Sequence, residues 1–274
     1  MRKNILLAAL LCFGGVAQAA TSEPVEIPTD DKPLQAVIFR PAGAGPFPAI
    51  VALHGCDGLR LNNGQIRKPV EDWGQLLSAA GFIVLFPDSY GSRGLGNQCS
   101  VKAPAIRPDR ERVADTRAAR DWLQQQDFIR KDRISLLGWA SGGIAALWAI
   151  RPSLEPSDDR PDFRSAAVFY PGCRRLGDTA WSTRVPTLIL IGALDNWTPA
   201  KHCEDMVKNA RGRSAQAVIV KYKGAHHAFD HDNAPLRQRS RMAFAPDPGG
   251  RVTVGTNADA RADALKRIPQ WLAR

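Results

Sequence analysis

The sequence predicts an α/β fold built on a mostly parallel central sheet with helices on both faces. Short apolar runs alternate along the chain with longer amphipathic segments, and this order repeats several times. The run 49–53 (AIVAL) is apolar at every position, which is typical of a strand buried on both faces. A strand, helix, strand order joins parallel strands and places helices over the sheet. Ligands of such sheets bind beyond the carboxyl ends of the strands, so the loops there are the candidates for chemistry.

Each element has its own signal in the sequence. Residues 70–80 carry apolar side chains at helical spacing, and Gly81 ends that helix. Pro87-Asp88 closes the strand 82–86, and a polar, glycine-rich loop follows over 89–108. The expected strands cover 34–40, 49–53, 82–86, 134–137, 166–170, 187–191 and 217–222. The expected helices cover 70–80, 110–126, 144–150, 199–210 and 258–272.

Residues 1–19 have the pattern of a secretory signal peptide. Arg2 and Lys3 precede an apolar run over 5–16, and Ala17-Gln18-Ala19 offers small residues to a signal peptidase. The apolar run is shorter than the roughly 20 residues that a membrane-spanning helix needs. We therefore expect a cleaved signal and a periplasmic or secreted mature chain. The remaining residues, 20–274, have a length that suits a single α/β domain.

The chain is basic, with 37 Lys and Arg against 27 Asp and Glu and a formal net charge of +10. These cations are scattered, and no basic run is interleaved with aromatic side chains, as a binder of single-stranded nucleic acid would need. The solvated, basic surface of an exported protein is the better interpretation. We expect no nucleic-acid partner, no stable membrane insertion and a monomer.

The segment 134–143 combines a strand, a tight turn and a helix, which is the pattern of a nucleophile elbow. In such an elbow the residues two before and two after the nucleophile must be small, because the backbone closes on itself there. Position 140 has Gly138 and Gly142 at these places, whereas position 141 would have Trp139 at the first of them. Sterics therefore select position 140. That residue is Ala140, and a methyl group cannot attack a carbonyl carbon.

Three explanations for Ala140 stay open. A natural Ser or Cys has been replaced by Ala to give an inactive form, or the protein is a naturally inactive relative of active enzymes. In the third explanation Ser141 is the nucleophile of a distorted elbow. A glycine-rich turn with no catalytic ancestry is a weaker interpretation, because of the loops that accompany it.

One of these loops, His54-Gly55-Cys56, follows the strand 49–53. Hydrolases with this kind of elbow place one backbone N–H of an oxyanion hole there, and the residue after the nucleophile provides the other. By position, the two donors would be the N–H groups of Cys56 and Ser141. The His54 imidazole would hold the loop. An ordinary β-to-α loop is the alternative.

Asp195 ends one strand, and His226 and His227 follow the next strand. The elbow, the Asp and the His thus occur in the order that such a hydrolase requires. The Asp would orient the imidazole, and the His would take and return a proton. Asp195 could instead cap the helix start at Thr198-Pro199. A metal site is the alternative for the His and Asp residues of 226–232, but they include no helical His pair, so we expect no metal.

These motifs together resemble the dienelactone hydrolase family of α/β-hydrolases, over nearly all of the mature chain. The matching segments are HGCDGL (54–59), FPDSYGSRG (86–94), GWASGG (138–143), GALDNWTPA (192–200) and YKGAHHAFD (222–230). The resemblance implies the α/β-hydrolase fold and hydrolysis of an ester or lactone through a covalent acyl-enzyme, with no cofactor. It also selects His227 over His226, because a small or β-branched apolar residue and then Phe follow the catalytic histidine in relatives.

The sequence departs from the family at two places. Members carry Cys or Ser where Ala140 stands. Dienelactone hydrolases in the strict sense have a Glu in the loop after the central strand, where this chain has His54-Gly55. The second departure favours a broader carboxylesterase-like activity over the eponymous lactone. The expected machinery is position 140 with His227 and Asp195. The alternative is a catalytically degenerate hydrolase fold that binds a small molecule or partner without turnover.

Three other side chains are candidates for the substrate pocket. Arg93, in the loop after the strand 82–86, would either bind a substrate carboxylate or anchor its own long loop. Tyr90 and Trp197 would line the pocket, although ordinary wall packing explains them equally well.

Four cysteines remain once Cys12 is removed with the signal, and an even number indicates disulfides in an exported protein. The loops bearing Cys56 and Cys99 follow neighbouring strands, as do those bearing Cys173 and Cys203. We therefore predict the bridges Cys56–Cys99 and Cys173–Cys203, which would brace the loops of the site. A reactive thiol at Cys56 is the alternative.

Overall fold

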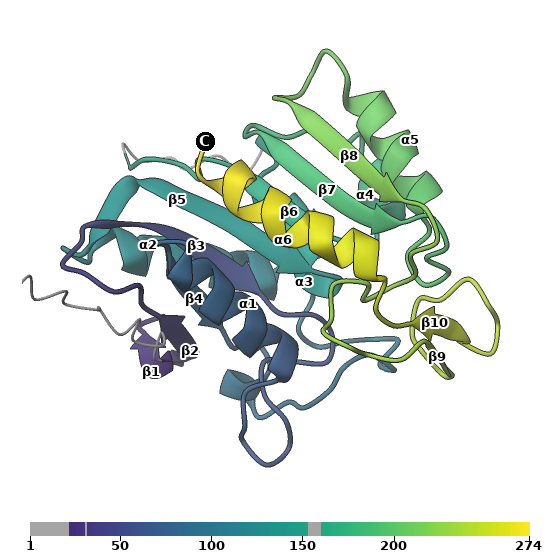
Figure 1. Ribbon diagram of the computed structural model, residues 1–274, viewed down its shortest axis with the longest axis horizontal. Coiled ribbons are helices and arrows are strands. Elements are labelled where there is room, and N and C mark those ends of the chain that lie inside the picture. Colours follow the sequence, from purple (N-terminus) through teal and green to yellow (C-terminus); the bar gives the residue numbers. More distant parts are fainter. Residues whose placement is uncertain (1–21, 31, 153–159) are drawn as a thin grey trace, which may run out of the picture.

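The central element is an eight-stranded sheet with the strand order β1-β2-β4-β3-β5-β6-β7-β8 (Figure 1). The computed structural model describes residues 22–30, 32–152 and 160–274, so the predicted signal peptide, 1–19, lies outside the described residues. The strands from β3 to β8 pair in parallel, while β1 and β2 form an antiparallel edge beside β4. Their bounds are β1 Ser22–Ile27, β2 Leu34–Phe39, β3 Phe47–Leu53, β4 Ile83–Pro87, β5 Ile129–Trp139, β6 Ala166–Phe169, β7 Thr187–Gly192 and β8 Ala217–Tyr222. The predicted mostly parallel sheet is confirmed.

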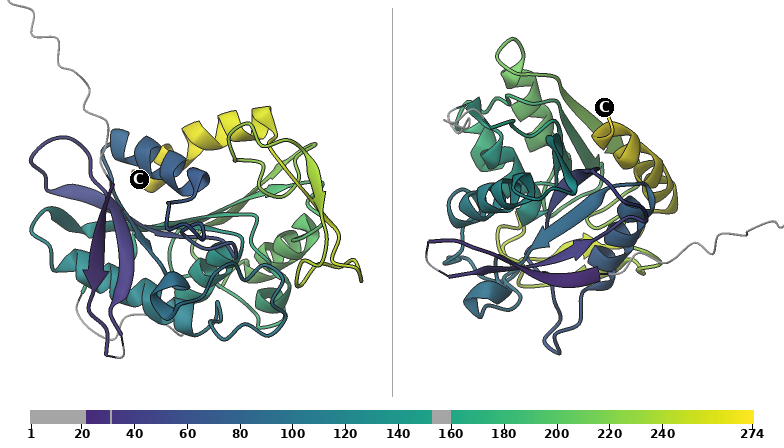
Figure 2. Two further views of the ribbon diagram at one scale, coloured as in Figure 1. Left: turned by 90° about the horizontal axis from the view of Figure 1, so that it is seen from below. Right: turned by 90° about the vertical axis from the view of Figure 1, so that its left-hand side faces the viewer.

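Helices cover both faces of this sheet, as predicted. In Figures 1 and 2, α1 and α6 lie on one face, and α2, α3 and α5 lie on the other. Their bounds are α1 Lys68–Ala79, α2 Glu111–Gln124, α3 Ser141–Ala149, α4 Arg174–Gly177, α5 Ala200–Ala210 and α6 Ala258–Leu272. Within the described parts of the chain, no helix is long and apolar enough to cross a membrane.

Burial explains why the apolar runs form the middle of the sheet. Ala49 to Leu53 of β3 and the neighbouring Leu136 and Leu137 of β5 are inaccessible to solvent. A strand buried on both faces places every side chain in the core, which accounts for a continuous apolar run in place of an alternating one. Helix α3 begins at Ser141, three residues before the expected start at Ile144, because the chain passes from β5 into the helix through a single-residue turn.

Sequence analysis did not predict several short elements. They are β1, the 3-10 turn η1 (Gly91–Arg93), α4 and the two-stranded ribbon of β9 (Arg237–Arg239) and β10 (Val252–Val254). The strand β9 reads RQR and is mostly exposed, so it carries no apolar signal. A parallel bridge between His227 and Val254 joins this ribbon to the loop that follows β8.

Both predicted disulfides are present. Cys56 pairs with Cys99, and Cys173 pairs with Cys203, with Cα–Cα distances of 4.9 Å in each case. The first bridge ties the loop after β3 to the loop after β4. The second ties the segment after β6 to α5. The bridged Cys56 is therefore not a free thiol.

We expect Cys203→Ser to lower the free energy of unfolding by about 2–4 kcal/mol, because the unfolded chain regains the freedom of a loop closed by the bridge. Denaturant unfolding without reductant measures the change, and with reductant, which breaks the bridges of both proteins, the parent protein and the variant should unfold alike. In the unreduced, denatured mature protein, a thiol reagent should find none of the four cysteines free. Four reactive groups would contradict both bridges.

Candidate active site

The turn between β5 and α3 has the close approaches that the sequence predicts. A Cβ atom added at Gly138 would lie 2.6 Å from the carbonyl oxygen of Gly142, and one added at Gly142 would lie 2.1 Å from that of Leu53. Ala140 stands between them at φ 47° and ψ −113°, a conformation that L-residues rarely adopt. Such backbone strain costs about 1–3 kcal/mol and clusters at functional sites.

Ser141, the alternative nucleophile, has its hydroxyl bound elsewhere. Its Oγ accepts a hydrogen bond of 3.0 Å from Nη1 of Arg112, which is completely buried. Nη2 of the same guanidinium donates to the carbonyl oxygen of His54 at 2.7 Å. Within the described residues, Ser141 makes no hydrogen bond to His227. Arg112 thus joins the start of α3 to the loop after β3.

The structure brings Asp195 and His227 together at 2.8 Å, between Oδ2 of the carboxylate and Nδ1 of the imidazole. Both side chains are buried, at 4% exposure each. Oδ1 of Asp195 accepts from the backbone N–H groups of Trp197 and Thr198, at 2.9 and 2.8 Å. One carboxylate oxygen thus contacts the imidazole and the other holds the turn before α5. The alternative role as a helix cap is not observed, because the N-cap of α5 is Pro199 and no described side chain caps this helix.

Aromatic rings fix the plane of the His227 imidazole. Its centroid lies 4.3 Å from the ring of Tyr170 and 4.7 Å from that of Trp197. The His227 carbonyl accepts from the N–H of Gly255 at 3.0 Å, which secures the backbone. Among the described residues, His226 makes no hydrogen bond or ion pair with Asp195, and its Nδ1 has no hydrogen-bond partner.

The two predicted oxyanion donors lie next to the turn. A Cβ at Gly55 would stand 3.8 Å from the Cβ of Ala140, so the residue before Cys56 faces position 140. In the described part of the chain, neither the Cys56 N–H nor the Ser141 N–H has an acceptor. Two unpaired donors beside one position can stabilise a negative oxygen there.

His54 is completely enclosed behind this loop. Its Nδ1 lies 2.8 Å from the carbonyl oxygen of Gly55, and its Nε2 lies 3.8 Å from Oδ1 of Asp88. Burial, and then the nearby charge of Arg112, hold the pKa of His54 well below the ordinary value of 6.5. A neutral imidazole that holds the loop agrees with the structural role expected for it.

Asp230 forms a hydrogen-bonded centre that sequence analysis missed. Its buried carboxylate accepts from Nε1 of Trp73 at 2.8 Å, from Nε1 of Trp139 at 2.9 Å and from the hydroxyl of Tyr170 at 2.7 Å. Burial and the Asp230 charge raise the pKa of Tyr170 well above 10, so the phenol stays protonated and keeps donating. The carboxylate thereby connects the residue before Ala140 with the ring that packs on His227.

Of the three candidate pocket residues, one anchors a loop and two line a cavity. Arg93 donates to Asp115 through both terminal nitrogens, at 3.0 and 2.8 Å, and to the carbonyl oxygen of Ser89 at 2.8 Å. It does not line either cavity at the site, so the structure favours the loop-anchoring role and corrects the carboxylate-binding one. Tyr90 and Trp197 do line cavity walls.

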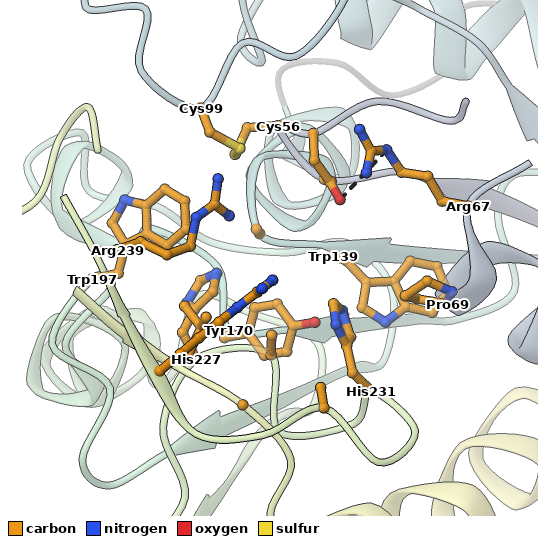
Figure 3. Close-up of a pocket in the computed structure, with 18 of the residues that line it drawn as sticks. Cys56, Arg67, Pro69, Cys99, Trp139, Tyr170, Trp197, His227, His231 and Arg239 are labelled. Atoms are coloured by element: carbon orange, nitrogen blue, oxygen red, sulfur yellow. Dashed lines mark ion pairs between the residues drawn. A yellow bond between two sulfur atoms is a disulfide. The ribbon is translucent and has the colours of Figure 1, made fainter. Parts of the chain in front are cut away.

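Two cavities meet at position 140. One, of about 580 Å³, contains Ala140, His227 and Tyr170 together with Arg67 and Arg239, which the sequence did not single out (Figure 3). The other, of about 840 Å³, continues past Ser141 and Ile144 of α3. No group of three or more His, Cys, Asp or Glu side chains is placed to hold a metal ion within the described ranges.

Stability should fall in acid because of His54. Its folded-state pKa is below that of the unfolded chain, so the unfolded state binds more protons. The contribution of the neutral His54 to the free energy of unfolding is fully present above pH 6.5, and it is lost as the pH falls through 6.5 toward the folded-state pKa. Urea unfolding at pH 7.5 and 5.5 should show a loss approaching about 1.4 kcal/mol per pH unit below that value. In His54→Asn this part of the loss should vanish; an equal loss in the variant would contradict the assignment.

Replacing the acceptor at Asp230 should destabilise the protein. Asp230→Asn places an N–H₂ group against three donors, which leaves buried groups unpaired and lowers the free energy of unfolding by about 3 kcal/mol. Asp232→Asn is the matched control, since Asp232 is more exposed and makes a 3.1 Å ion pair with Arg261. It should change stability by less than about 1 kcal/mol. Similar losses in both variants would contradict a special role for Asp230.

Comparisons with known proteins identify the family of the chain. The chain matches the dienelactone hydrolase family over residues 34–274. A Bradyrhizobium protein assigned as a 2-oxo-3-(5-oxofuran-2-ylidene)propanoate lactonase is 26% identical over 75% of this chain and 82% of its own. A Yersinia pestis protein assigned as a carboxymethylenebutenolidase is 26% identical over 76% of this chain and 79% of its own.

Solved structures share the fold. A Klebsiella pneumoniae protein assigned as a dienelactone hydrolase has a TM-score of 0.70 at 21% identity, covering 94% of this chain and 100% of its own. Thermogutta terrifontis esterase 2 has a TM-score of 0.63 at 19% identity, covering 96% of this chain and 97% of its own. From the family match, the motifs and the fold together, the chain belongs to the dienelactone hydrolase family of α/β-hydrolases.

Proposed function

We propose that the protein is an exported hydrolase of esters or lactones whose nucleophile position, 140, carries no nucleophile in this chain. His227 is the general base and acid, and Asp195 orients it. The N–H groups of Cys56 and Ser141 are the oxyanion donors. One observation carries the proposal: His227, whose buried imidazole lies 2.8 Å from the Asp195 carboxylate, lines the same cavity as the strained Ala140.

The chemistry follows from the orientation of the imidazole. Its Nδ1 meets Asp195, so Nε2 is the nitrogen left to exchange a proton with a group at position 140. A hydroxyl there would give its proton to Nε2 and attack the ester carbonyl, while the two N–H groups stabilise the oxyanion. Collapse expels the alcohol with that proton, and water then releases the acid by the same route. No step needs a cofactor.

Ala140 stops this series of reaction steps at the start, because it has no oxygen that could form a bond to the ester carbonyl carbon. The cavity can still bind an ester, because binding uses the walls and the oxyanion donors and not the missing oxygen. The second candidate function is therefore a hydrolase-type fold that binds a small molecule without turnover, and Ala140 itself is the observation that favours it.

The substrate class follows from the relatives and from the departures noted above. Two relatives are named for lactones, which supports an ester or lactone as the bond attacked. His54-Gly55 replaces the Glu of strict dienelactone hydrolases, which favours a broader range of carboxylic esters. The two disulfides and the signal pattern support export of residues 20–274 as one domain, and we propose a monomer.

Ala140→Ser should create an esterase. Hydrolysis of p-nitrophenyl acetate should rise by up to about 10⁶-fold over the parent chain, the order by which removal of the serine nucleophile lowers turnover in a complete triad. A fluorophosphonate probe should then label residue 140. Adding His227→Asn to Ala140→Ser should abolish both signals, whereas adding Ser141→Ala should preserve them, because the backbone N–H stays.

The rival explanations give different results in the same assays. Silence of a folded Ala140→Ser variant with both reagents would favour the binding protein. Labelling of the parent chain at Ser141 would show that the nucleophile is assigned to the wrong residue.

A further inference from the structure

The two cavities share part of their walls at position 140 and are otherwise lined by different segments of the chain. Five residues line both: Cys56, Cys99, Ala140, Trp197 and His227. An ester bond that lies against Ala140 and His227 is therefore at the junction of the two cavities. A molecule that fills both must extend in two directions from that bond.

The first cavity carries an excess of positive charge. Its cations are Arg67 and Arg239 (Figure 3), together with Arg237. The single carboxylate among the described residues of its wall is that of Asp57, which lies 3.7 Å from Arg67. Among the described residues, Arg239 has no carboxylate within ion-pair distance. Its guanidinium lies 6.0 Å from the ring centroid of Trp197, one of the shared walls.

Arg239 is also half-buried, and this burial lowers the pKa of its guanidinium more than the charge of Asp57, which makes no ion pair with it, raises that pKa. A desolvated cation without a carboxylate partner gains more from an anionic ligand than a solvated one does. The cation comes from β9, the polar strand of the ribbon that bridges to the His227 loop.

The second cavity has apolar walls. Tyr90, Val101, Pro104, Ile106, Ile144 and Trp148 line it. Four of its described lining residues are cations. Arg107 and Arg175 contact the Asp109 carboxylate, at 2.5 and 3.6 Å, and Lys102 and Arg174 are exposed to solvent. A hydrocarbon or aromatic group is the occupant that these walls favour.

We propose that the site takes open-chain monoesters with two unlike arms: a carboxylate that reaches Arg239 in the first cavity, and an apolar group that fills the second. The scissile ester lies between them, at Ala140. This inference rests on the proposed function and narrows its substrate class, because a compact lactone would leave one cavity unfilled. Hydrolysis adds water across the ester and gives one acid and one alcohol, each retaining its arm.

The parent chain allows a direct binding test, because Ala140 leaves the ester intact. Titration calorimetry would compare three probes: monobenzyl succinate with both arms, benzyl methyl succinate with the apolar arm and no charge, and monomethyl succinate with the charge alone. We expect the two-armed probe to bind about 10-fold or more tightly than either of the others. Equal affinities for all three would overturn the proposal.

Variants assign the arms to their cavities. Arg239→Met should remove the preference for monobenzyl succinate over its methyl ester, while Arg239→Lys should retain part of it. Arg241→Met is the matched control, because Arg241 is an exposed cation of the same segment that lines neither cavity. Trp148→Ala should weaken the two benzyl probes and leave monomethyl succinate unchanged. An unchanged preference in folded Arg239→Met would contradict the anionic arm.

Failure of this inference can be distinguished from failure of the proposed function. Turnover of p-nitrophenyl acetate by Ala140→Ser needs neither arm. Activity there without discrimination among the three probes would refute the two-armed substrate and leave the hydrolase intact. Discrimination without any turnover would refute the hydrolase and leave a binding site for such esters.

Discussion

The close approach of α3 to the loop after β3 is the constraint on which the rest of the site depends. Gly142 has room for no side chain, because a Cβ there would stand 2.1 Å from the Leu53 carbonyl oxygen. This contact forces the single-residue turn at Ala140 and sets the Ser141 N–H beside the loop that carries Cys56. Arg112 and the Cys56–Cys99 bridge then hold that loop in place. The proposed oxyanion site is made of backbone groups and needs such rigidity, since it works only when the donors are fixed beforehand.

A second centre fixes the other half of the site. The Asp230 carboxylate binds two indoles and one phenol, and through them it links β5, the segment after β6 and the loop that carries His227. A buried carboxylate is costly unless donors surround it, and here neutral donors do so without a cation. The same hydrogen bonds hold Tyr170 against the imidazole. The position of His227 is thus determined by packing from one side and by Asp195 from the other.

Much of the sheet could be predicted because buried strands are continuous apolar runs, and α6 begins and ends where its periodicity indicates. The elbow could also be placed, since steric exclusion of Trp139 is a local argument. The contacts of Asp230 and Arg112 could not. The partners of Asp230 are 60 to 157 positions away from it in the chain, and those of Arg112 are 29 to 58 positions away. A local sequence pattern carries no information on such distant pairings. Likewise, nothing in RQR at 237–239 distinguishes a cavity wall from an exposed turn.

The energetic cost of the site bears on how Ala140 should be understood. A non-glycine residue in this turn is strained by about 1–3 kcal/mol, and burying the Asp195–His227 pair adds a desolvation cost. A glycine at 140 would relieve the first cost, and apolar residues at 195 and 227 would remove the second. The chain has neither a glycine at position 140 nor apolar residues at positions 195 and 227. Under the proposed function, one oxygen atom on the β-carbon of residue 140 is therefore what separates this site from a complete nucleophile–His–Asp arrangement.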